Sequence, residues 1–218
     1  MTKSTSDSHH EARNKDWHLT IENEMETEIK VLGSRFIAHA LPAQSAEEFI
    51  ARLANLKKLH YSATHHCFAY RLGADCHIFR YHDDGEPSGT AGKRILGAID
   101  RVQLTNTAVV VIRYFGGTKL GVSRLGQAYG DAAREVLSQI PVIKKFIRLA
   151  FRLFFEYDHM STVHHLIETH GAEILDRQFD ELVCYSLDIR ASSFSAFENA
   201  VRDMLPHTVR MERVNNEE

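Results

Sequence analysis

Two glycine-rich loops hold the residues whose types and spacing suggest chemistry. Residues 83–93 read DDGEPSGTAGK, residues 113–121 read RYFGGTKLG, and nine of the twelve glycines lie between Gly85 and Gly130. Glycine lets another molecule approach the backbone N–H groups, and a helix that starts after such a loop presents those groups and its dipole to an anion. Because both loops precede helix-like sequence, we expect them to form a surface for an anionic partner.

The local charge also favours an anionic partner. Between Ser88 and Gly130 there are six lysines and arginines but only one acid, Asp100, although the whole chain has a net charge of −3. The overall charge argues against a protein that is basic everywhere, so any binding of nucleic acid must be local. The predicted anion- or RNA-binding residues are Lys93, Arg94, Arg113, Gly116, Gly117, Thr118, Lys119 and Arg124.

The first loop is also acidic and could bind a ligand through its carboxylates and hydroxyls. Such groups can hold a divalent cation or act as a general base, and a hydroxyl becomes a nucleophile if a histidine converges on it. We prefer a simpler interpretation, a solvated turn whose acids lie near a helix start and pair with Arg94 or Arg113. The candidate ligand residues are Asp83, Asp84, Glu86, Ser88 and Thr90.

Standard motifs for nucleotides, metals and nucleophiles are missing from the sequence. The nearest approach to a Walker loop, Gly121 to Gly126, is followed by Gln127 in place of lysine. The histidines and cysteines between residues 60 and 82 lack the repeated short spacing of a zinc site, and His65 and His66 would point to opposite faces of a strand. We therefore expect no metal and no cofactor, and the catalytic residues, if any, are unknown.

Apolar periodicity divides the chain into a polar tail and two domains. Residues 1–19 bury too little apolar surface to order and are expected to form a disordered tail. Residues 20–142 are expected to form the first domain, in which the apolar run 108–112 indicates a strand buried on both faces. Its other predicted elements are a hairpin turning at Gly33 and Ser34, a helix capped by Ser45, strands at 64–72 and 76–82, and helices from about residue 90 and at 123–139.

After Pro141 the pattern changes, and residues 143–218 are expected to form the second domain. The predicted strands are 147–157, 172–179, 182–189 and 208–214, and the predicted helices run from Asp158 to His170 and from Ser193 or Ser195 to Leu205. This βαββαβ order is typical of a ferredoxin-like domain. The predicted fold class is therefore α+β for both domains.

The cysteines and the hydropathy together predict the cellular compartment of the protein. The three cysteines are an odd number and lack the CxxC spacing, which fits a reduced intracellular compartment. The sequence also lacks the roughly 18 consecutive apolar residues that a membrane span requires. We expect a cytoplasmic protein without membrane contact.

Four separate motifs resemble the YigZ/IMPACT family. They are the two glycine-rich loops and the runs 30–38 (KVLGSRFIA) and 63–71 (ATHHCFAYR). The resemblance implies that residues near 20–140 adopt the fold shared by a small-subunit ribosomal protein domain and domain IV of elongation factor G. It also implies that the second domain is similar to domain V of that factor. The chain departs from the family where Arg124 replaces a small residue and Gln127 a basic one.

The motifs and the charge lead to one preferred function and two alternatives. Eukaryotic IMPACT proteins regulate translation by competing for the activator of a starvation-responsive initiation-factor kinase, whereas bacterial members lack an agreed activity. We prefer a non-enzymatic protein that binds structured RNA or the ribosome and modulates translation. One alternative is an enzyme or small-anion binder in which the acidic loop meets Gly116 and Gly117 across a cleft. The other is regulation through a protein partner, and the sequence leaves the oligomeric state open.

Overall fold

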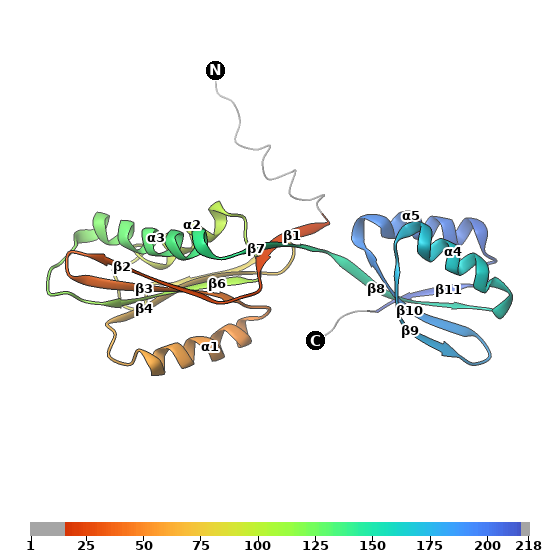
Figure 1. Ribbon diagram of the computed structural model, residues 1–218, viewed down its shortest axis with the longest axis horizontal. Helices are drawn as coiled ribbons and strands as arrows, with labels where there is room; N and C mark the ends of the chain where they lie inside the picture. Colours follow the sequence, from red (N-terminus) through yellow and green to blue (C-terminus); the bar gives the residue numbers. More distant parts are fainter. Residues whose placement is uncertain (1–15, 215–218) are drawn as a thin grey trace, which may run out of the picture. The chain divides into compact units, whose positions relative to one another are not determined.

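The computed structural model describes residues 16–214, which fold into two compact units. One unit comprises His18–Lys145, and the other combines the residues from Phe146 onward with the segment that ends at Trp17. Each unit has its own sheet and its own apolar core. The chain is therefore an α+β protein with two sheet-containing domains, as predicted (Figure 1).

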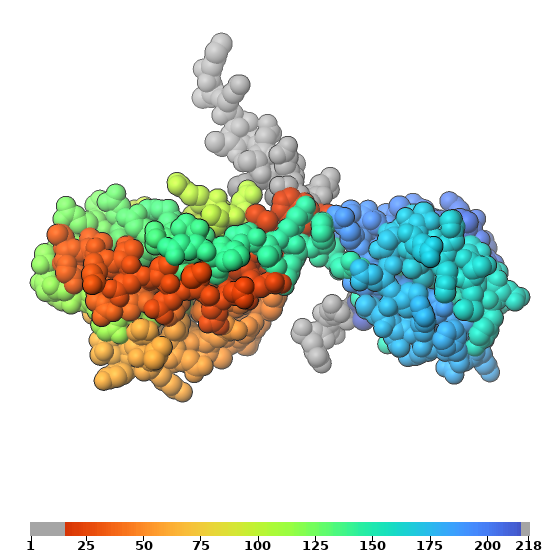
Figure 2. All heavy atoms as spheres, in the orientation of Figure 1, coloured from red at the N-terminus to blue at the C-terminus, as the bar shows by residue number. Residues whose placement is uncertain are grey.

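The first unit is built around a five-stranded antiparallel sheet with helices on both faces. The strand order β2-β3-β6-β4-β5 places β6 in the centre. Helices α2 and α3 pack on one face and α1 on the other (Figure 1), and α1 forms the lower, orange surface of this unit in Figure 2. The elements are β2 (Met25–Val31), β3 (Ser34–Pro42), α1 (Ala46–Leu59), β4 (His65–Leu72), β5 (Ile78–His82), α2 (Gly92–Arg101), β6 (Thr107–Tyr114) and α3 (Gly121–Gln139).

Strand β6 explains why both faces of the sheet are covered. Every residue from Thr107 to Arg113 is buried, which confirms the prediction from the apolar run. Because strand side chains alternate, Val109 and Val111 join the core under α2 and α3, while Val110 and Ile112 join the core under α1. A sheet with this pattern needs a helical layer on each side.

Local capping and turn signals set the ends of the neighbouring elements. The Ser45 hydroxyl accepts a hydrogen bond from the Glu48 amide at 3.1 Å, which confirms the predicted start of α1. The predicted hairpin joins β2 to β3, but its turn lies at Leu32 and Gly33, one residue earlier than expected. Both turn residues have positive φ, and Ser34 already belongs to β3.

The second unit has the predicted βαββαβ order. Its sheet is antiparallel with the order β11-β8-β10-β9, and α4 and α5 contribute to a single core with the strands. None of the helices in the described part of the chain is long and apolar enough to span a membrane. The elements are β8 (Arg148–Phe155), α4 (Met160–His170), β9 (Glu173–Phe179), β10 (Val183–Arg190), α5 (Ala191–Met204) and β11 (Arg210–Arg213).

Two helix starts in this unit differ from the prediction. Helix α4 begins at Met160 because a short 3-10 turn, Tyr157–His159, comes first. Helix α5 begins at Ala191, ahead of the serines expected to cap it. Arg190, the residue before α5, makes no side-chain cap hydrogen bond, and the Ser192 hydroxyl in the first turn donates to the Asp16 carboxylate at 2.5 Å.

Regular secondary structure also begins earlier than expected, at Trp17. Strand β1 (Trp17–Ile21) pairs with β7 (Val142–Phe146), so residues 17–19 are not part of a tail. Asp16 accepts hydrogen bonds from Arg190 at 3.0 and 3.1 Å, and its backbone carbonyl accepts from Ile147. Polar contacts of this kind leave no mark in a hydropathy pattern. Residues 1–15, the rest of the predicted tail, lie outside the described residues.

Candidate functional site

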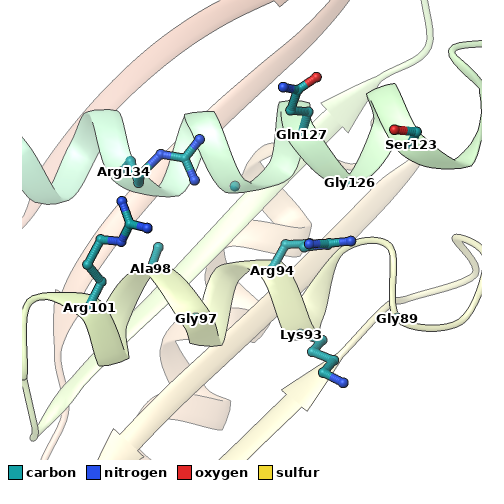
Figure 3. A pocket seen from close by; sticks show the side chains of 11 residues that line it. Gly89, Lys93, Arg94, Gly97, Ala98, Arg101, Ser123, Gly126, Gln127 and Arg134 are labelled. Atoms are coloured by element: carbon teal, nitrogen blue, oxygen red, sulfur yellow. The ribbon is translucent and has the colours of Figure 1, made fainter. Parts of the chain in front are cut away.

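A groove with a cavity volume of about 680 Å³ lies between α2 and α3 of the first unit. Small residues line its floor, among them Gly97, Gly126 and Gly130 (Figure 3). No carboxylate is found among the described residues that line it. The basic residues lining the groove are Lys93, Arg94, Arg101 and Arg134.

Helix periodicity places these residues on the facing sides of the two helices. Arg94 and Arg101 are seven residues apart on α2, about two helical turns, and Gly97 lies between them on the same face. On α3, Gly130 and Arg134 follow the same rule at a spacing of four residues. The groove therefore arises mostly from two helix faces, to which the loop before α2 adds Gly89.

The glycines of the groove differ in what they make room for. A Cβ at Gly126 would lie 3.2 Å from Arg94 Nε, and a Cβ at Gly130 would lie 3.1 Å from Arg134 Nη1. These two glycines let arginine side chains lie close to α3. A Cβ at Gly97 would meet no atom within 4 Å. Gly97 thus leaves the floor of the groove open without serving any internal contact.

Most of the positive charge in the groove is not neutralised by the protein. Arg134 contacts Asp131 on the same helix, but the other three basic side chains make no ion pair with a carboxylate in residues 16–214. Several other arginines of this unit are paired; Arg71, for example, lies 2.6 Å from Asp100. An exposed concentration of uncompensated positive charge attracts anions.

The first glycine-rich loop uses its own amides. Asp83 Oδ1 accepts hydrogen bonds from the amides of Ala91 and Gly92 at 2.9 and 2.8 Å, and its Oδ2 accepts from Gly89 at 2.8 Å. We expected these amides to face an anionic ligand, and that expectation is wrong. The Asp83 carboxylate already occupies the start of α2 and supplies the negative charge that the helix dipole favours.

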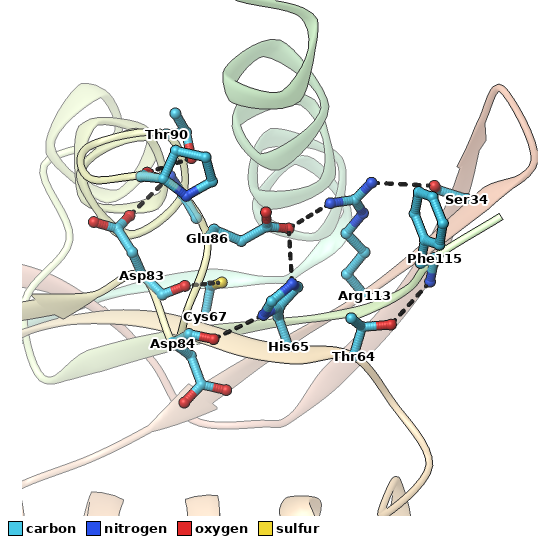
Figure 4. A network of polar contacts seen from close by, with 12 residues as sticks. Ser34, Thr64, His65, Cys67, Asp83, Asp84, Glu86, Thr90, Arg113 and Phe115 are labelled. Carbon is cyan, nitrogen blue, oxygen red and sulfur yellow. Dashed lines mark hydrogen bonds and ion pairs between the residues drawn. The ribbon is translucent and has the colours of Figure 1, made fainter. Parts of the chain in front are cut away.

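Glu86 and Arg113 form a buried ion pair beside this loop (Figure 4). Arg113 Nη1 and the Tyr129 hydroxyl both donate to Glu86 Oε1, at 2.6 and 2.8 Å, and burial raises the pKa of Tyr129. The guanidinium lies 5.5 Å from the ring centroids of both Phe36 and Phe115. Arg113 is only 5% exposed, so its predicted role as a phosphate contact is wrong. The predicted pairing of an acid of this loop with Arg113 is confirmed, but the prediction of a solvated turn is wrong for Glu86, which is 8% exposed.

Asp84 fastens the same loop to β4. Its backbone carbonyl accepts from His65 Nδ1 at 2.8 Å (Figure 4). Its Oδ2 accepts from the His66 amide at 2.7 Å, and its Oδ1 lies 3.3 Å from Lys57 Nζ. Burial alone would raise the pKa of Asp84, but the His66 amide and the Lys57 ammonium outweigh burial and lower it. The carboxylates of this loop therefore serve to hold it in place.

The remaining polar groups near the loop do not form a reactive cluster. The Thr90 hydroxyl is buried and donates to the Pro87 carbonyl at 2.6 Å, whereas Ser88 is exposed. Cys67 donates to the Asp83 carbonyl, and burial raises the pKa of its thiol to about 12, which makes it a poor nucleophile. Within residues 16–214, no group of three or more histidine, cysteine, aspartate or glutamate side chains is placed to hold a metal ion.

The second glycine-rich loop packs against the β2–β3 hairpin. The Gly116 amide donates to the Ser34 hydroxyl at 3.1 Å, and a Cβ at Gly116 would lie 1.9 Å from the carbonyl carbon of Gly33. Gly116 is thus required for close backbone packing, and the prediction that its amide positions a phosphate is wrong. Four other predicted residues are exposed but do not line the groove: Gly117, Thr118, Lys119 and Arg124.

The structure brings only two of the predicted binding residues, Lys93 and Arg94, into the groove. Sequence reasoning counted Arg101 in the local charge but did not assign it to the site, and it missed Arg134. The spacing of seven residues between Arg94 and Arg101 would have identified a shared helix face. Arg134 lies beyond Gly130, where the charge count ended.

Comparisons with known proteins agree with the motifs. The Impact N-terminal domain matches residues 32–137, and a domain of unknown function matches residues 153–205. An IMPACT family member of Haemophilus influenzae is 36% identical over 180 residues, which cover 82% of this chain and 86% of that protein. IMPACT family member YvyE of Bacillus subtilis is 33% identical over 190 residues, 86% of each chain. The chain belongs to the IMPACT family.

The matched regions place the groove within the family's N-terminal domain. The Impact N-terminal match includes both glycine-rich loops, all of α2, and α3 as far as Leu137. A solved structure described as a hypothetical protein has a TM-score of 0.67 and 25% identity, and the alignment covers 93% of this IMPACT family chain and 99% of that one. The similarity therefore covers both sheet-containing domains.

Proposed function

We propose that this IMPACT family protein is a cytoplasmic, non-enzymatic protein that binds structured RNA or the ribosome through the α2–α3 groove and modulates translation. One observation carries the proposal: four basic side chains line the groove, and three of them, Lys93, Arg94 and Arg101, pair with no carboxylate in residues 16–214. Guanidinium groups bind phosphate oxygens through directed hydrogen bonds. Phosphate contacts in turn supply much of the affinity of proteins for nucleic acids.

The folds of the two units add support by analogy. We assign the second unit to the ferredoxin-like folds because its βαββαβ order comes with the strand order β11-β8-β10-β9. We assign the first unit to the fold shared by a small-subunit ribosomal protein domain and domain IV of elongation factor G. A fold hosts many functions, so the charged groove remains the stronger argument.

The alternative of an enzyme or small-anion binder has less support. It required the acidic loop and the second glycine-rich loop to present free groups to one ligand. Asp83 instead caps α2, Glu86 pairs with Arg113, and Gly116 binds Ser34. Regulation through a protein partner would show itself as binding that survives high salt, because apolar contacts are not screened.

The test is salt-titrated binding of purified ribosomal RNA to the full chain and to charge variants. Arg94→Glu/Arg101→Glu reverses the two unpaired arginines of the groove. The matched control, Lys58→Glu/Arg80→Glu, makes the same change in net charge at exposed positions outside the groove. We expect the groove variant to lose binding at physiological salt and the control to retain it.

A neutral version of the groove variant measures the number of phosphate contacts. The plot of log K against log salt has a negative slope, and each lost phosphate contact reduces the magnitude of that slope by about 0.7–0.9. Arg94→Gln/Arg101→Gln should therefore reduce it by about 1.5. The loop variant Lys119→Glu/Arg124→Glu should have a smaller effect than reversal in the groove. Equal retention of ribosomal RNA by wild type and the groove variant would contradict the proposal.

A further inference from the structure

The basic side chains are spread along the groove and not gathered at one point. Arg101 and Arg134 point toward each other near one end, while Arg94 extends toward Ser123 at the other (Figure 3). A rise of 1.5 Å per residue separates the backbones of Arg94 and Arg101 by about 10.5 Å. A row of charges suits a ligand with several anionic groups in series better than a single small anion.

Gly97 lies in the middle of this row, and the packing of the protein does not require a glycine there. Its φ is not positive, and an added Cβ would meet no atom within 4 Å. Glycine weakens a helix interior relative to alanine. A glycine that weakens a helix and that no internal contact requires indicates a functional position. At Gly97 the space that a side chain would fill is available to a ligand.

We propose that the groove receives the sugar–phosphate backbone of an RNA strand, and that this backbone comes closest to α2 at Gly97, between Arg94 and Arg101. The inference rests on the proposed function and adds the ligand class and the contact point. Arg94 and Arg101 then bind successive parts of the strand, and Arg134 reaches the strand from α3. A side chain at position 97 would lie between the two arginines and hold the backbone away from both.

The experiment fills the floor of the groove without changing its charge. Gly97→Ala and Gly97→Leu are compared with wild type for binding of purified ribosomal RNA and for thermal stability. Ala54→Leu adds comparable bulk at an exposed position on α1, which packs on the opposite face of the sheet, and serves as the control. Both Gly97 variants should fold, because Gly97 is exposed and a Cβ there would meet no atom within 4 Å.

We expect Gly97→Leu to weaken RNA binding about tenfold, which is the loss of one charge-assisted hydrogen bond. Gly97→Ala should weaken binding less, and Ala54→Leu should bind as wild type does. The Tm of the Gly97 variants should stay constant or rise by about 2–4 °C, because the glycine is gone from the helix. Weaker binding by a more stable protein cannot be a folding defect.

Other results would overturn the inference in distinguishable ways. If Gly97→Leu binds like wild type while Arg94→Glu/Arg101→Glu does not, the backbone does not approach Gly97, and the proposed function stands. If neither variant affects binding, both proposals fail. If an RNA oligonucleotide binds no more tightly than inorganic phosphate does, the groove holds a small anion and not a strand.

Discussion

Arginine has two different environments in the first unit. Arg113 is 5% exposed and donates to Glu86, and two aromatic rings flank its guanidinium. Arg94 and Arg101 are exposed, line a groove and lack a carboxylate partner among the described residues. A buried charge must be paired, whereas an exposed charge is stable without a partner. The comparison separates a cation that holds the fold from cations available to a ligand.

The largest effect should come from removing the partner of the buried arginine. Glu86→Gln leaves Arg113 buried without a counter-charge, which should lower the free energy of unfolding of the first unit by about 3–5 kcal/mol. Urea unfolding with hydrogen exchange of the β6 amides as a local readout would measure it. Glu47→Gln, at an exposed position of α1, should cost less than about 0.5 kcal/mol.

A second variant separates lost pairing from lost packing in the Glu86 experiment. Arg113→Met removes the buried charge while keeping an unbranched side chain between the rings. The double variant Glu86→Gln/Arg113→Met should therefore be more stable than Glu86→Gln alone. If it is less stable by the sum of the two single effects, the ion pair does not explain the burial of Arg113.

Two buried histidines lie on the face of the sheet that α1 covers. They extend the comparison of buried and exposed cations, because a histidine becomes a cation only when it is protonated. His39 and His66 are 8% and 7% exposed, and the Nε2 atom of each lacks a hydrogen-bond partner. Burial lowers the pKa of both below the usual 6.5, although Glu26 opposes this for His39 and Asp84 for His66. The charge of neighbouring His60 also lowers the pKa of both, although the His60 backbone opposes this for His66.

The lowered pKa values predict that the first unit loses stability in mild acid. The unfolded chain binds protons near pH 6.5 while the folded chain does not, so stability is complete above that pH and declines as the pH falls below it. Urea unfolding between about pH 7.5 and pH 5.5 should show this decline, and His39→Gln should reduce it. The exposed His77→Gln should retain the wild-type decline. A pH dependence that is unchanged in His39→Gln would show that His39 does not contribute.

Sequence patterns predicted the elements whose signals are local. The apolar run of β6, the Ser45 cap of α1 and the βαββαβ order of the second unit all depend on residues close together in the chain. The contribution of residues 16–19 to the fold could not be predicted in this way. Asp16 is held by Arg190, 174 residues away, and no local periodicity encodes that contact.

The candidate site was predicted only in part for the same reason. Charge counting located Lys93 and Arg94, but it could not show that Arg113 points inward to Glu86. The glycine loops suggested free amides, yet Asp83 reaches eight and nine residues along the chain to bind them. Arg134 joins the groove only because α3 packs beside α2. Which charges are free is decided by tertiary contacts.

The smallest effect should come from neutralising the arginines of the groove. Arg94→Gln/Arg101→Gln removes no ion pair with a described carboxylate, so the free energy of unfolding should stay within about 0.5 kcal/mol of wild type. Arg71→Gln removes a contact between β4 and Asp100 of α2, and it should cost up to about 1 kcal/mol. Urea unfolding of both variants in parallel makes the comparison. A clear loss of stability in the groove variant would place these arginines with Arg113, as residues that hold the fold. Unchanged stability together with weaker RNA binding would show that their charge serves the ligand alone.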